Sequence, residues 1–279
     1  MARGEEVVSR AVRFWKLEGA GNDFLGLDGR AGGFKLKRQQ IADLCDRRRG
    51  VGADGVLVVE KPKVRGADFR MRYYNSDGGE AEMCGNGARC FALLARAVSG
   101  RKGKELRVQT QAGLLTLRMS GREVQVSMTE PTKLRLGRKL VVAGRKLAVD
   151  FLNTGVPHAV LFVRSVRSID VAKQGRAIRY HSAFAPSGTN VNFVEIGRGN
   201  RIHVRTYERG VEGETLACGT GVVAASILSN LRRGLRPPIQ VATRGGDNVR
   251  VGFSMENGHA RKVTLQGPAR IVYRGVLHV

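Results

Sequence analysis

Much of the chain alternates apolar and polar residues over short stretches, a period of two that is typical of β-strands. In the first half these stretches are residues 69–74, 106–111, 114–119 and 123–128. In the second half they are residues 160–163, 190–196, 202–207, 239–243, 249–253, 261–266 and 270–276. The pattern predicts a fold dominated by short, mostly antiparallel strands.

Two other segments are apolar on most helical faces, and each is predicted to form a helix. They cover residues 86–98 and 220–232, and the glycine that ends each one, Gly100 or Gly234, is a common helix stop. A helix that is apolar on nearly all sides is buried, so we expect each one to be surrounded by sheet.

The two halves of the chain share landmarks at one offset. Cys84 and Cys218 lie 134 residues apart, and each follows a tyrosine by eleven residues, Tyr73 or Tyr207. The glycine turns in GAGNDFLGL and NTGVPHAVLFV keep the same separation. Three landmarks in one order predict two copies of one unit, and hence an α+β fold of two pseudo-symmetric domains.

The boundary between these domains is predicted near Glu130-Pro131, where a strand ends and a basic linker begins. The first domain then spans residues 1–130 and the second residues 131–268. We assign the last segment, residues 269–279, to the first domain, although the sequence alone leaves its partner open.

Composition limits the kind of protein. The chain has 279 residues, is 42% hydrophobic and 26% charged. It holds no apolar run near the ~18 residues that span a bilayer. The first ten residues, MARGEEVVSR, lack the apolar segment of a signal peptide. We therefore expect a cytoplasmic protein without a membrane partner.

The formal net charge of +24 invites a nucleic-acid partner, because clustered lysine and arginine attract phosphate. The basic residues are dispersed, however, apart from runs at Arg47–Arg49 and in residues 133–146. No helix-turn-helix, zinc-finger or stacking-aromatic signature accompanies them. A specific nucleic-acid partner is not expected, and a basic DNA- or RNA-binding protein is kept as a third hypothesis.

The four cysteines do not form a disulfide framework in a chain of this length. None belongs to a CxxC pair, and no histidine follows at finger-like spacing, so no metal site is expected. We expect Cys45 and Cys90 to be buried apolar side chains. Cys84 and Cys218 differ, because each opens a Cys-Gly-x-Gly turn into a predicted helix.

These two turns suit proton transfer. A helix start offers free N–H groups and the positive end of the helix dipole, which bind a carboxylate and lower the pKa of a nearby thiol. Two such thiols on opposite faces of one carbon can remove a proton and return it with inverted configuration. The chain shows neither a nucleotide fingerprint nor a cofactor-lysine motif, so we expect no cofactor.

In these residues the chain resembles the diaminopimelate epimerase family, a group of PLP-independent amino-acid isomerases with two catalytic cysteines. The motifs are GAGNDF, GVGADGVLV, YNSDGGEAEMCGNGARC, NTGVPHAV, TNVNFV and YERGVEGETLACGTG, in that order. The resemblance implies two domains, each a sheet wrapped round a central helix, with the site in the cleft between them. It implies interconversion of LL- and meso-diaminopimelate, a step of lysine and peptidoglycan precursor biosynthesis.

The resemblance also implies roles for individual residues. Cys84 and Cys218 match the catalytic acid and base. The positions matching substrate-binding residues are Asn22, Asn75, Gly85, Asn86, Asn190, Glu208, Arg209, Gly219 and Thr220. His158 and Glu208 match positions that adjust the proton affinity of the cysteines. Tyr273 falls where the family places a homodimer contact, although a tyrosine of the core fits the sequence equally well.

Two positions depart from some family members. Val156 stands where an asparagine helps to bind the distal end of the substrate, and Gly55 stands where others have glutamine. Both departures concern substrate identity and leave the cysteine motifs intact. A cofactor-independent racemase of another amino acid, such as histidine or glutamate, is therefore the alternative to a diaminopimelate epimerase.

Overall fold

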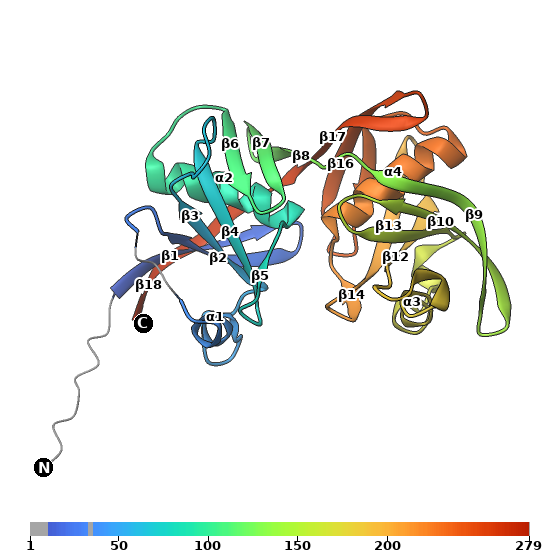
Figure 1. Ribbon diagram of the computed structural model, residues 1–279, viewed down its shortest axis with the longest axis horizontal. Coiled ribbons are helices and arrows are strands. Elements are labelled where there is room, and N and C mark those ends of the chain that lie inside the picture. The colour runs from blue at the N-terminus through green and yellow to red at the C-terminus, as the bar shows by residue number, and fades with distance from the viewer. Residues whose placement is uncertain (1–10, 33–35, 279) are drawn as a thin grey trace, which may run out of the picture.

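A computed structural model provides the structure of the chain and describes residues 11–32 and 36–278. The prediction that no signal peptide is present rests on residues 1–10, which lie outside the described part. Figure 1 shows two lobes side by side, each built from a sheet that curves round a helix. The α+β fold of two pseudo-symmetric units, predicted from the 134-residue offset, is confirmed.

The first lobe contains β1 (Ala11–Gly19), β2 (Asn22–Asp28), α1 (Arg38–Cys45), β3 (Gly55–Glu60), β4 (Phe69–Asn75), β5 (Glu80–Ala81), α2 (Gly85–Ser99), β6 (Glu105–Thr110), β7 (Gly113–Ser120) and β8 (Glu123–Ser127). Its strands pair in the order β1, β2, β3, β4, β6, β7 and β8. The β2–β3 and β4–β6 pairs are parallel and the others are antiparallel.

The second lobe contains β10 (Arg145–Asn153), β11 (Pro157–Phe162), α3 (Val171–Arg179), β12 (Asn190–Ile196), β13 (Arg201–Glu208), β14 (Gly213–Thr215), α4 (Gly219–Arg233), β15 (Ile239–Ala242), β16 (Asn248–Glu256) and β17 (His259–Pro268). The order β10, β11, β12, β13, β15, β16 and β17 repeats that of the first lobe. The parallel pairs, β11–β12 and β13–β15, occupy the same places in that order.

The two predicted central helices are confirmed as α2 and α4. Each ends at a glycine with a left-handed backbone, Gly100 at φ 70° and Gly234 at φ 69°. Most of their residues are buried in one core with the surrounding strands. The apolar faces predicted from the sequence therefore meet sheet, as expected.

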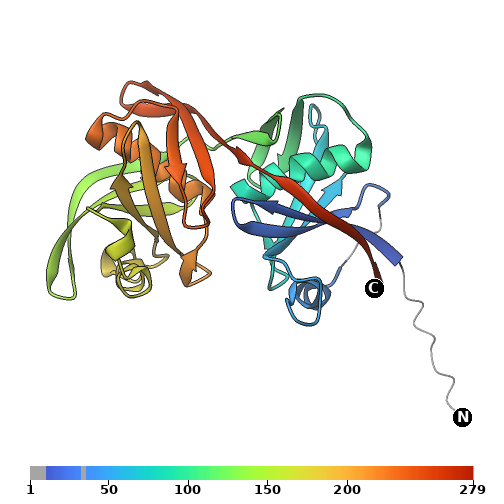
Figure 2. The same ribbon diagram turned by 180° about the vertical axis from the view of Figure 1, so that it is seen from behind.

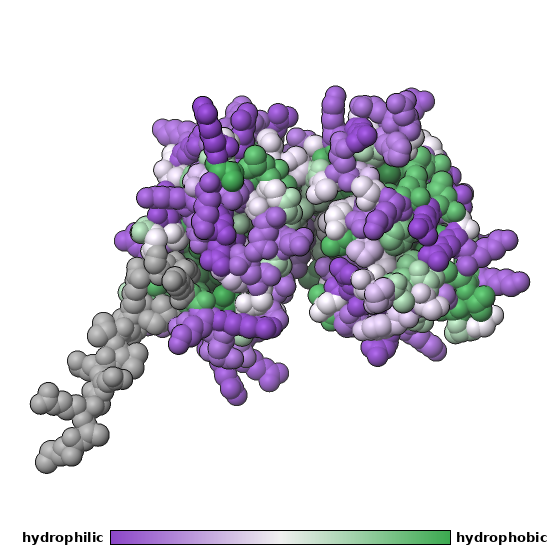
Figure 3. Space-filling view, in the orientation of Figure 1, coloured by the Kyte–Doolittle hydropathy of each residue, from purple (hydrophilic) through white to green (hydrophobic). Residues whose placement is uncertain are grey.

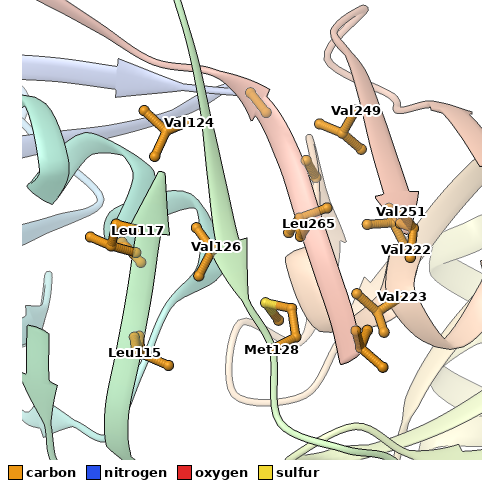
Figure 4. Packing of buried hydrophobic residues seen from close by; sticks show 14 of the residues in the cluster. Leu115, Leu117, Val124, Val126, Met128, Val222, Val223, Val249, Val251 and Leu265 are labelled. Atoms are coloured by element: carbon orange, nitrogen blue, oxygen red, sulfur yellow. The ribbon is translucent and has the colours of Figure 1, made fainter. Parts of the chain in front are cut away.

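The lobes are joined where β8 pairs antiparallel with β17. Figure 4 shows Val126 of β8 facing Leu265 of β17, with valines of β16 and α4 on the other side of β17. Beyond this pair the chain crosses over twice. After β8 it enters the second lobe as β9 (Thr132–Val142), which pairs with β10, and after β17 it returns as β18 (Arg270–His278), which pairs with β1.

Figure 2 shows β18 running back across the first lobe beside β1. On this connectivity we propose a domain boundary near residue 130, with residues 269–278 belonging to the first domain.

The prediction of a basic linker after residue 130 was wrong, because residues 132–142 form a strand. The apolar and basic residues of TKLRLGRKL do alternate, but nearly all of them are exposed. The backbone is satisfied by β10, and lysine and arginine side chains on an exposed strand discourage pairing with another molecule. Figure 3 shows hydrophilic side chains spread over the same face of both lobes.

Candidate active site

A cavity of about 190 Å³ gathers residues of both lobes and contains both motif cysteines. Its lining consists of Asn22, Tyr73, Asn75, Ala81, Met83, Cys84, Gly85, Asn86, Val156, Asn190, Glu208, Arg209, Ala217, Cys218, Gly219 and Thr220. Apart from His158, every residue matched to a substrate or catalytic position lies in this lining. Larger cavities of 290–370 Å³ are lined by no cysteine.

The starts of α2 and α4 meet at this cavity. Cys84 and Cys218 are the N-cap residues of the two helices. A Cβ built on Gly219 would lie 3.5 Å from the Cα of Gly85, and one built on Gly85 would lie 3.7 Å from the Cα of Gly219. Two helix N-termini in contact place two sets of free N–H groups and two positive dipole ends together, an arrangement suited to a carboxylate.

Each cysteine sulfur contacts the first turn of its own helix. The backbone N–H of Gly87 donates to Cys84 Sγ at 3.4 Å, and Thr220 Oγ1 lies 3.6 Å from Cys218 Sγ. A Cβ on Gly221 would lie 3.3 Å from Cys218 Sγ, so the absence of a side chain there lets the helix approach the sulfur.

The expectation that the helix starts lower the thiol pKa was wrong for this structure. Burial raises the pKa of both Cys84 and Cys218 above the ordinary cysteine value. Cys218 is buried, with only 5% of its surface exposed, and Cys84 is half-buried. In a site this enclosed, the loss of water around a thiolate outweighs the favourable N–H groups. A thiolate in this cavity is therefore less stable than a thiolate in water.

The carboxyl of Glu208 lies beside Cys218. Burial raises the pKa of Glu208, while hydrogen bonds from Thr215 and from the Cys218 thiol lower it. Thr215 Oγ1 donates to Glu208 Oε2 at 2.9 Å. In turn, after burial itself, Glu208 is the largest cause of the raised pKa of Cys218. The carboxyl group of Glu208 therefore adds to burial in opposing loss of the proton from Cys218.

His158 does not line the cavity. It is completely buried on β11, with Nδ1 3.1 Å from Nδ2 of Asn192. That amide also donates to the carbonyl of Ala159, and its Oδ1 accepts from Thr206. Burial, helped by the charge of Arg209, lowers the pKa of His158 to about 3, so the ring is neutral at pH 7. Its Nε2 has no hydrogen-bond partner in the described residues.

Amide side chains and one guanidinium form the polar walls of the cavity. Asn86 donates to Asn22 and to the carbonyl of Ala217, and Asn22 donates to Asp54 at 3.0 Å. On the other lobe, Asn190 Oδ1 accepts from the backbone N–H of Arg209 at 2.7 Å. Asn75 ends β4 at the rim and is exposed.

The two positions that depart from some family members behave differently. Val156 lines the cavity with an apolar side chain. Gly55 does not line it. A Cβ on Gly55 would lie 2.4 Å from the carbonyl oxygen of Tyr74, so the backbone leaves no room for a side chain there. Of the two positions, only Val156 contributes to the wall of the cavity.

Several functional neighbours escaped sequence reasoning. Tyr73, Ala81, Met83 and Ala217 line the cavity, and Tyr73 had served only as a landmark of the repeat. The position of Tyr73 on β4, the strand that ends at Asn75, was the available signal. Asn192, Asp54 and Arg89 lie behind the lining, and only tertiary packing brings them close to it.

The remaining predictions concern other positions. Cys45 and Cys90 are buried, as predicted, and burial raises the pKa of Cys45 to about 11. Tyr273 is 46% exposed and packs edge-on against Phe14, so its alternative assignment to the core was wrong. Within residues 11–32 and 36–278, no group of three or more His, Cys, Asp or Glu is placed to hold a metal ion. The helices described there are too short or too polar to cross a membrane.

Comparison with known proteins identifies relatives of this chain. The model of the family described as diaminopimelate epimerase matches residues 14–134 and 151–272. The chain is 42% identical to a diaminopimelate epimerase of Aquifex aeolicus, covering 95% of this chain and 98% of the relative. It is 44% identical to one of Archaeoglobus fulgidus, covering 96% and 97%.

Solved structures share the fold at low identity. A PhzF-family phenazine biosynthesis protein of Bacillus anthracis aligns with a TM-score of 0.73 at 16% identity, covering 97% of this chain and 100% of the other. A hydroxyproline epimerase of Agrobacterium vitis, solved with trans-4-hydroxy-L-proline, aligns with a TM-score of 0.72 at 16% identity, covering 97% of this chain and 93% of the other.

Proposed function

The chain belongs to the diaminopimelate epimerase family, and on that basis we propose that it interconverts LL- and meso-diaminopimelate without a cofactor. The contact between the starts of α2 and α4 carries the proposal. It puts two cysteines and two sets of helix N–H groups into one cavity of amino-acid size. The substrate carboxylate at the reacting end sits at the joined helix starts, with its α-carbon between the sulfurs.

The reaction is a proton exchange between two faces of one carbon. A thiolate removes the α-proton, and the electron pair left on the carbon is delocalised into the carboxylate held by the helix N–H groups. The opposite thiol then donates its proton to the other face, which inverts the configuration and leaves a thiolate there. Each backbone donor aimed at the growing charge contributes about 2.7–4 kcal/mol by analogy with oxyanion-hole donors.

The other residues of the site bind the substrate or adjust the proton affinity of the cysteines. Asn22, Asn75, Asn190 and Arg209 hold the substrate, and the planar fork of Arg209 suits the distal carboxylate. Glu208 keeps the proton on Cys218. His158, neutral and hydrogen-bonded to Asn192, supports the start of α4, because a Cβ on Gly221 would lie 2.3 Å from Asn192 Oδ1.

The test is a chiral assay on diaminopimelate in heavy water. Wild-type protein should equilibrate the LL and meso forms and incorporate deuterium at the α-carbon. Cys84→Ala and Cys218→Ala should each abolish epimerisation, because the second face of the carbon then lacks its acid or base. Near-normal turnover by either variant would show that the two-base scheme is wrong.

A racemase of another amino acid remains the second candidate, and Val156 is the observation that favours it. Its side chain offers no hydrogen bond at a wall of the cavity. A panel that includes histidine and glutamate separates the two. Turnover of one of these, with none of diaminopimelate, would replace the first proposal.

The wider setting is also proposed. An enzyme of lysine and peptidoglycan precursor biosynthesis acts in the cytoplasm. A homodimer through the β1–β18 edge is supported by the exposed apolar residues Val272, Tyr273 and Val276. Sedimentation of Tyr273→Ala against wild-type protein tests it, since a monomeric variant is expected.

A further inference from the structure

A second cavity adjoins the catalytic one in the second lobe, and basic side chains line it. Its volume is about 340 Å³, against about 190 Å³ for the catalytic cavity. The cations of its lining are Lys133, Arg135, Arg138 and Arg209, and the described residues of the lining include no aspartate or glutamate. A concave site that gathers positive charge without a counter-charge of its own favours a negatively charged ligand.

These cations lack the carboxylate partners that other basic residues of the lobe have. Arg179, for comparison, pairs with Glu212 at 3.0 Å. In the part of the chain that the structure describes, none of the four belongs to an ion pair. Of the described side-chain hydrogen bonds, Arg138 makes one, to the carbonyl of Ala183 at 3.0 Å, and Arg135 makes none. The charge of the cavity is therefore available to a ligand.

A β-bulge puts Arg135 and Arg138 on one face of β9. In a regular strand, residues an odd number of positions apart point to opposite faces. Arg135 lies opposite Phe151 on β10. Arg138 lies opposite Val149, so a step of three residues on β9 matches a step of two on β10. Gly137 takes up the extra residue with a left-handed φ of 64°. Without the bulge, one guanidinium would point away from the cavity.

The backbone of β9 is also unusual at Lys133. Its φ is 55°, in the left-handed region that a lysine rarely adopts. A second shift of the β9–β10 register lies between Thr132 and Arg135. Backbone strain of this kind is typically retained where it positions a functional side chain. Here it adds an ammonium group to the cavity that the two arginines line.

Arg209 connects this cavity with the catalytic one, because it lines both. Its backbone N–H donates to Asn190 Oδ1 at 2.7 Å, whereas its guanidinium makes a long contact of 3.4 Å with the carbonyl of Ser187. Val156 lines the catalytic cavity, and the next residue, Pro157, lines the second. A guanidinium that is held so weakly can turn toward an anion in either cavity.

The donors of the cavity suit phosphate. A planar guanidinium donates two parallel N–H bonds to one anionic group, and a phosphate carries about two negative charges and three acceptor oxygens, so several cations can share it. The cavity is as large as roughly ten water molecules at ~30 Å³ each, which leaves room beyond one phosphate group. Phe151 and Phe184, stacked with ring centroids 5.9 Å apart, give it an apolar side.

We propose that this cavity binds a small phosphate-bearing molecule, and that the bound molecule inhibits the epimerase by drawing Arg209 away from the catalytic cavity. Lys133, Arg135 and Arg138 bind the phosphate, and Arg209 contacts it from the shared wall. The inhibitory part rests on the proposed function above, in which Arg209 holds the distal carboxylate of the substrate. Because phosphate and substrate compete for one guanidinium, bound phosphate raises the KM for the substrate and leaves kcat unchanged.

Binding is measured by isothermal titration calorimetry on the full chain, with inorganic pyrophosphate as the probe and no substrate present. The test variant is Arg135→Gln/Arg138→Gln. The matched control is Arg145→Gln/Lys146→Gln, which removes the same charge from the exposed start of β10, outside the cavity lining.

Wild type should bind pyrophosphate at a single saturable site. The test variant should bind at least about tenfold more weakly, because it loses charge-assisted hydrogen bonds. The control should stay within about threefold of wild type, because salt screens distant charges. Equal weakening in the two variants would indicate general attraction to a basic surface and would overturn the proposal, as would the absence of saturable binding to wild type.

The source of the phosphate is distinguished by further titrations. Inorganic phosphate and pyrophosphate represent a free anion, and AMP represents a nucleotide. Whichever binds most tightly and loses affinity in Arg135→Gln/Arg138→Gln supports the proposal and identifies the source. Citrate carries several negative charges without phosphorus, so tighter binding of citrate than of all three would overturn the assignment to phosphate.

Thermal unfolding checks that the variants fold. If the double variant does not fold, Arg135→Gln alone takes its place, because Arg135 makes no described side-chain hydrogen bond. Unchanged pyrophosphate affinity in folded Arg135→Gln would overturn the proposal, and failure of both variants to fold would do the same by assigning these arginines a structural role.

The role of Arg209 is tested in the chiral assay. Pyrophosphate should raise the KM of wild type for diaminopimelate severalfold at constant kcat, and should have little effect on Arg135→Gln/Arg138→Gln. Binding of pyrophosphate without a change in KM would overturn the inhibitory part. Calorimetry needs no substrate, so a wild-type protein inactive on diaminopimelate would refute the proposed function while the phosphate site is still decided.

Discussion

Gly221 and Gly87 occupy the same place in the two repeats, three residues after their cysteines, yet the structure predicts opposite tolerance to alanine. A Cβ on Gly221 would lie 2.3 Å from Oδ1 of the fully buried Asn192, where ordinary contact requires at least 3.4 Å. The equivalent Cβ on Gly87 would meet Cys84 Cβ and Leu57 Cδ2 at 3.3 Å, which small adjustments can relieve.

The cost of Gly221→Ala follows from what Asn192 must give up. To move by about 1 Å it loses hydrogen bonds with Thr206, Ala159 and His158 in a buried setting. Losing two of these costs about 3 kcal/mol, counting the desolvated groups left behind. Alanine returns up to about 1 kcal/mol through its better helix propensity. The net loss of about 2 kcal/mol lowers the melting temperature by roughly 4 °C.

Gly221→Ala should also lose much of its epimerase activity, because Cys218 moves with the first turn of α4. A misplacement of about 1 Å at a reacting group costs roughly 100-fold in rate. Differential scanning calorimetry and the chiral assay measure the two effects, with Gly87→Ala as the matched control. The melting temperature of Gly87→Ala should stay within about 2 °C of wild type, and its epimerisation rate within about tenfold. Equal losses in the two variants, or none in Gly221→Ala, would refute the reasoning.

Three further predictions concern ionisation and topology. Burial raises the pKa of Glu208, so the protonated carboxyl stabilises the fold below the ordinary glutamate pKa, and this contribution is lost as pH rises through the raised value. The melting temperature of Glu208→Gln should therefore exceed that of wild type at pH 7 but not at pH 4. The activity of Glu208→Gln should fall. The pKa of His158 is lowered to about 3, so its contribution to the free energy of unfolding is present above about pH 6.5 and is lost as pH falls toward 3. In urea unfolding, the stability of His158→Gln should therefore depend less on pH over that interval than the stability of wild type. An equal pH dependence of the two proteins would contradict this. Deleting residues 270–279 removes one of the two strands that pair with β1, and limited proteolysis should then cleave the first lobe before the second; uniform resistance would argue against the pairing.

Local signals in the sequence were enough for the two central helices, the alternating strands and the positions of the cysteines, whereas α1, α3, β1, β3 and β10 were not predicted. The glycine stops at Gly100 and Gly234 and the alternating stretches depend on neighbours within a few residues, and the structure places them as predicted. The internal repeat supplied the long-range information, because matched landmarks imply matched folds. Site residues carried by motifs, such as Asn190 and Arg209, then fell into the same cavity.

What the sequence could not supply was burial at the site. The lowering of thiol pKa by a helix start is a local effect, whereas its reversal at Cys218 depends on Glu208 and on water excluded by residues far apart in the chain. In the sequence Arg89 resembles an ordinary exposed helix residue, and its burial depends on contact with the distant strand that contains Gly267 and Pro268. Residues 132–142 were predicted to be a linker. They form a strand that is exposed over most of its length, so it lacks the buried apolar face by which strands are recognised in a sequence.

The pairing of β18 with β1 has a consequence for biosynthesis. Ala11 lies opposite His278, so β1 is synthesised long before β18, the strand that pairs with one of its two edges. The second lobe can assemble from residues 132–268 before β18 is made, but that edge of β1 stays unpaired until β18 emerges from the ribosome. During translation the unpaired edge needs protection from pairing with other chains, and substitutions in β18 should affect folding of the lobe that was synthesised first.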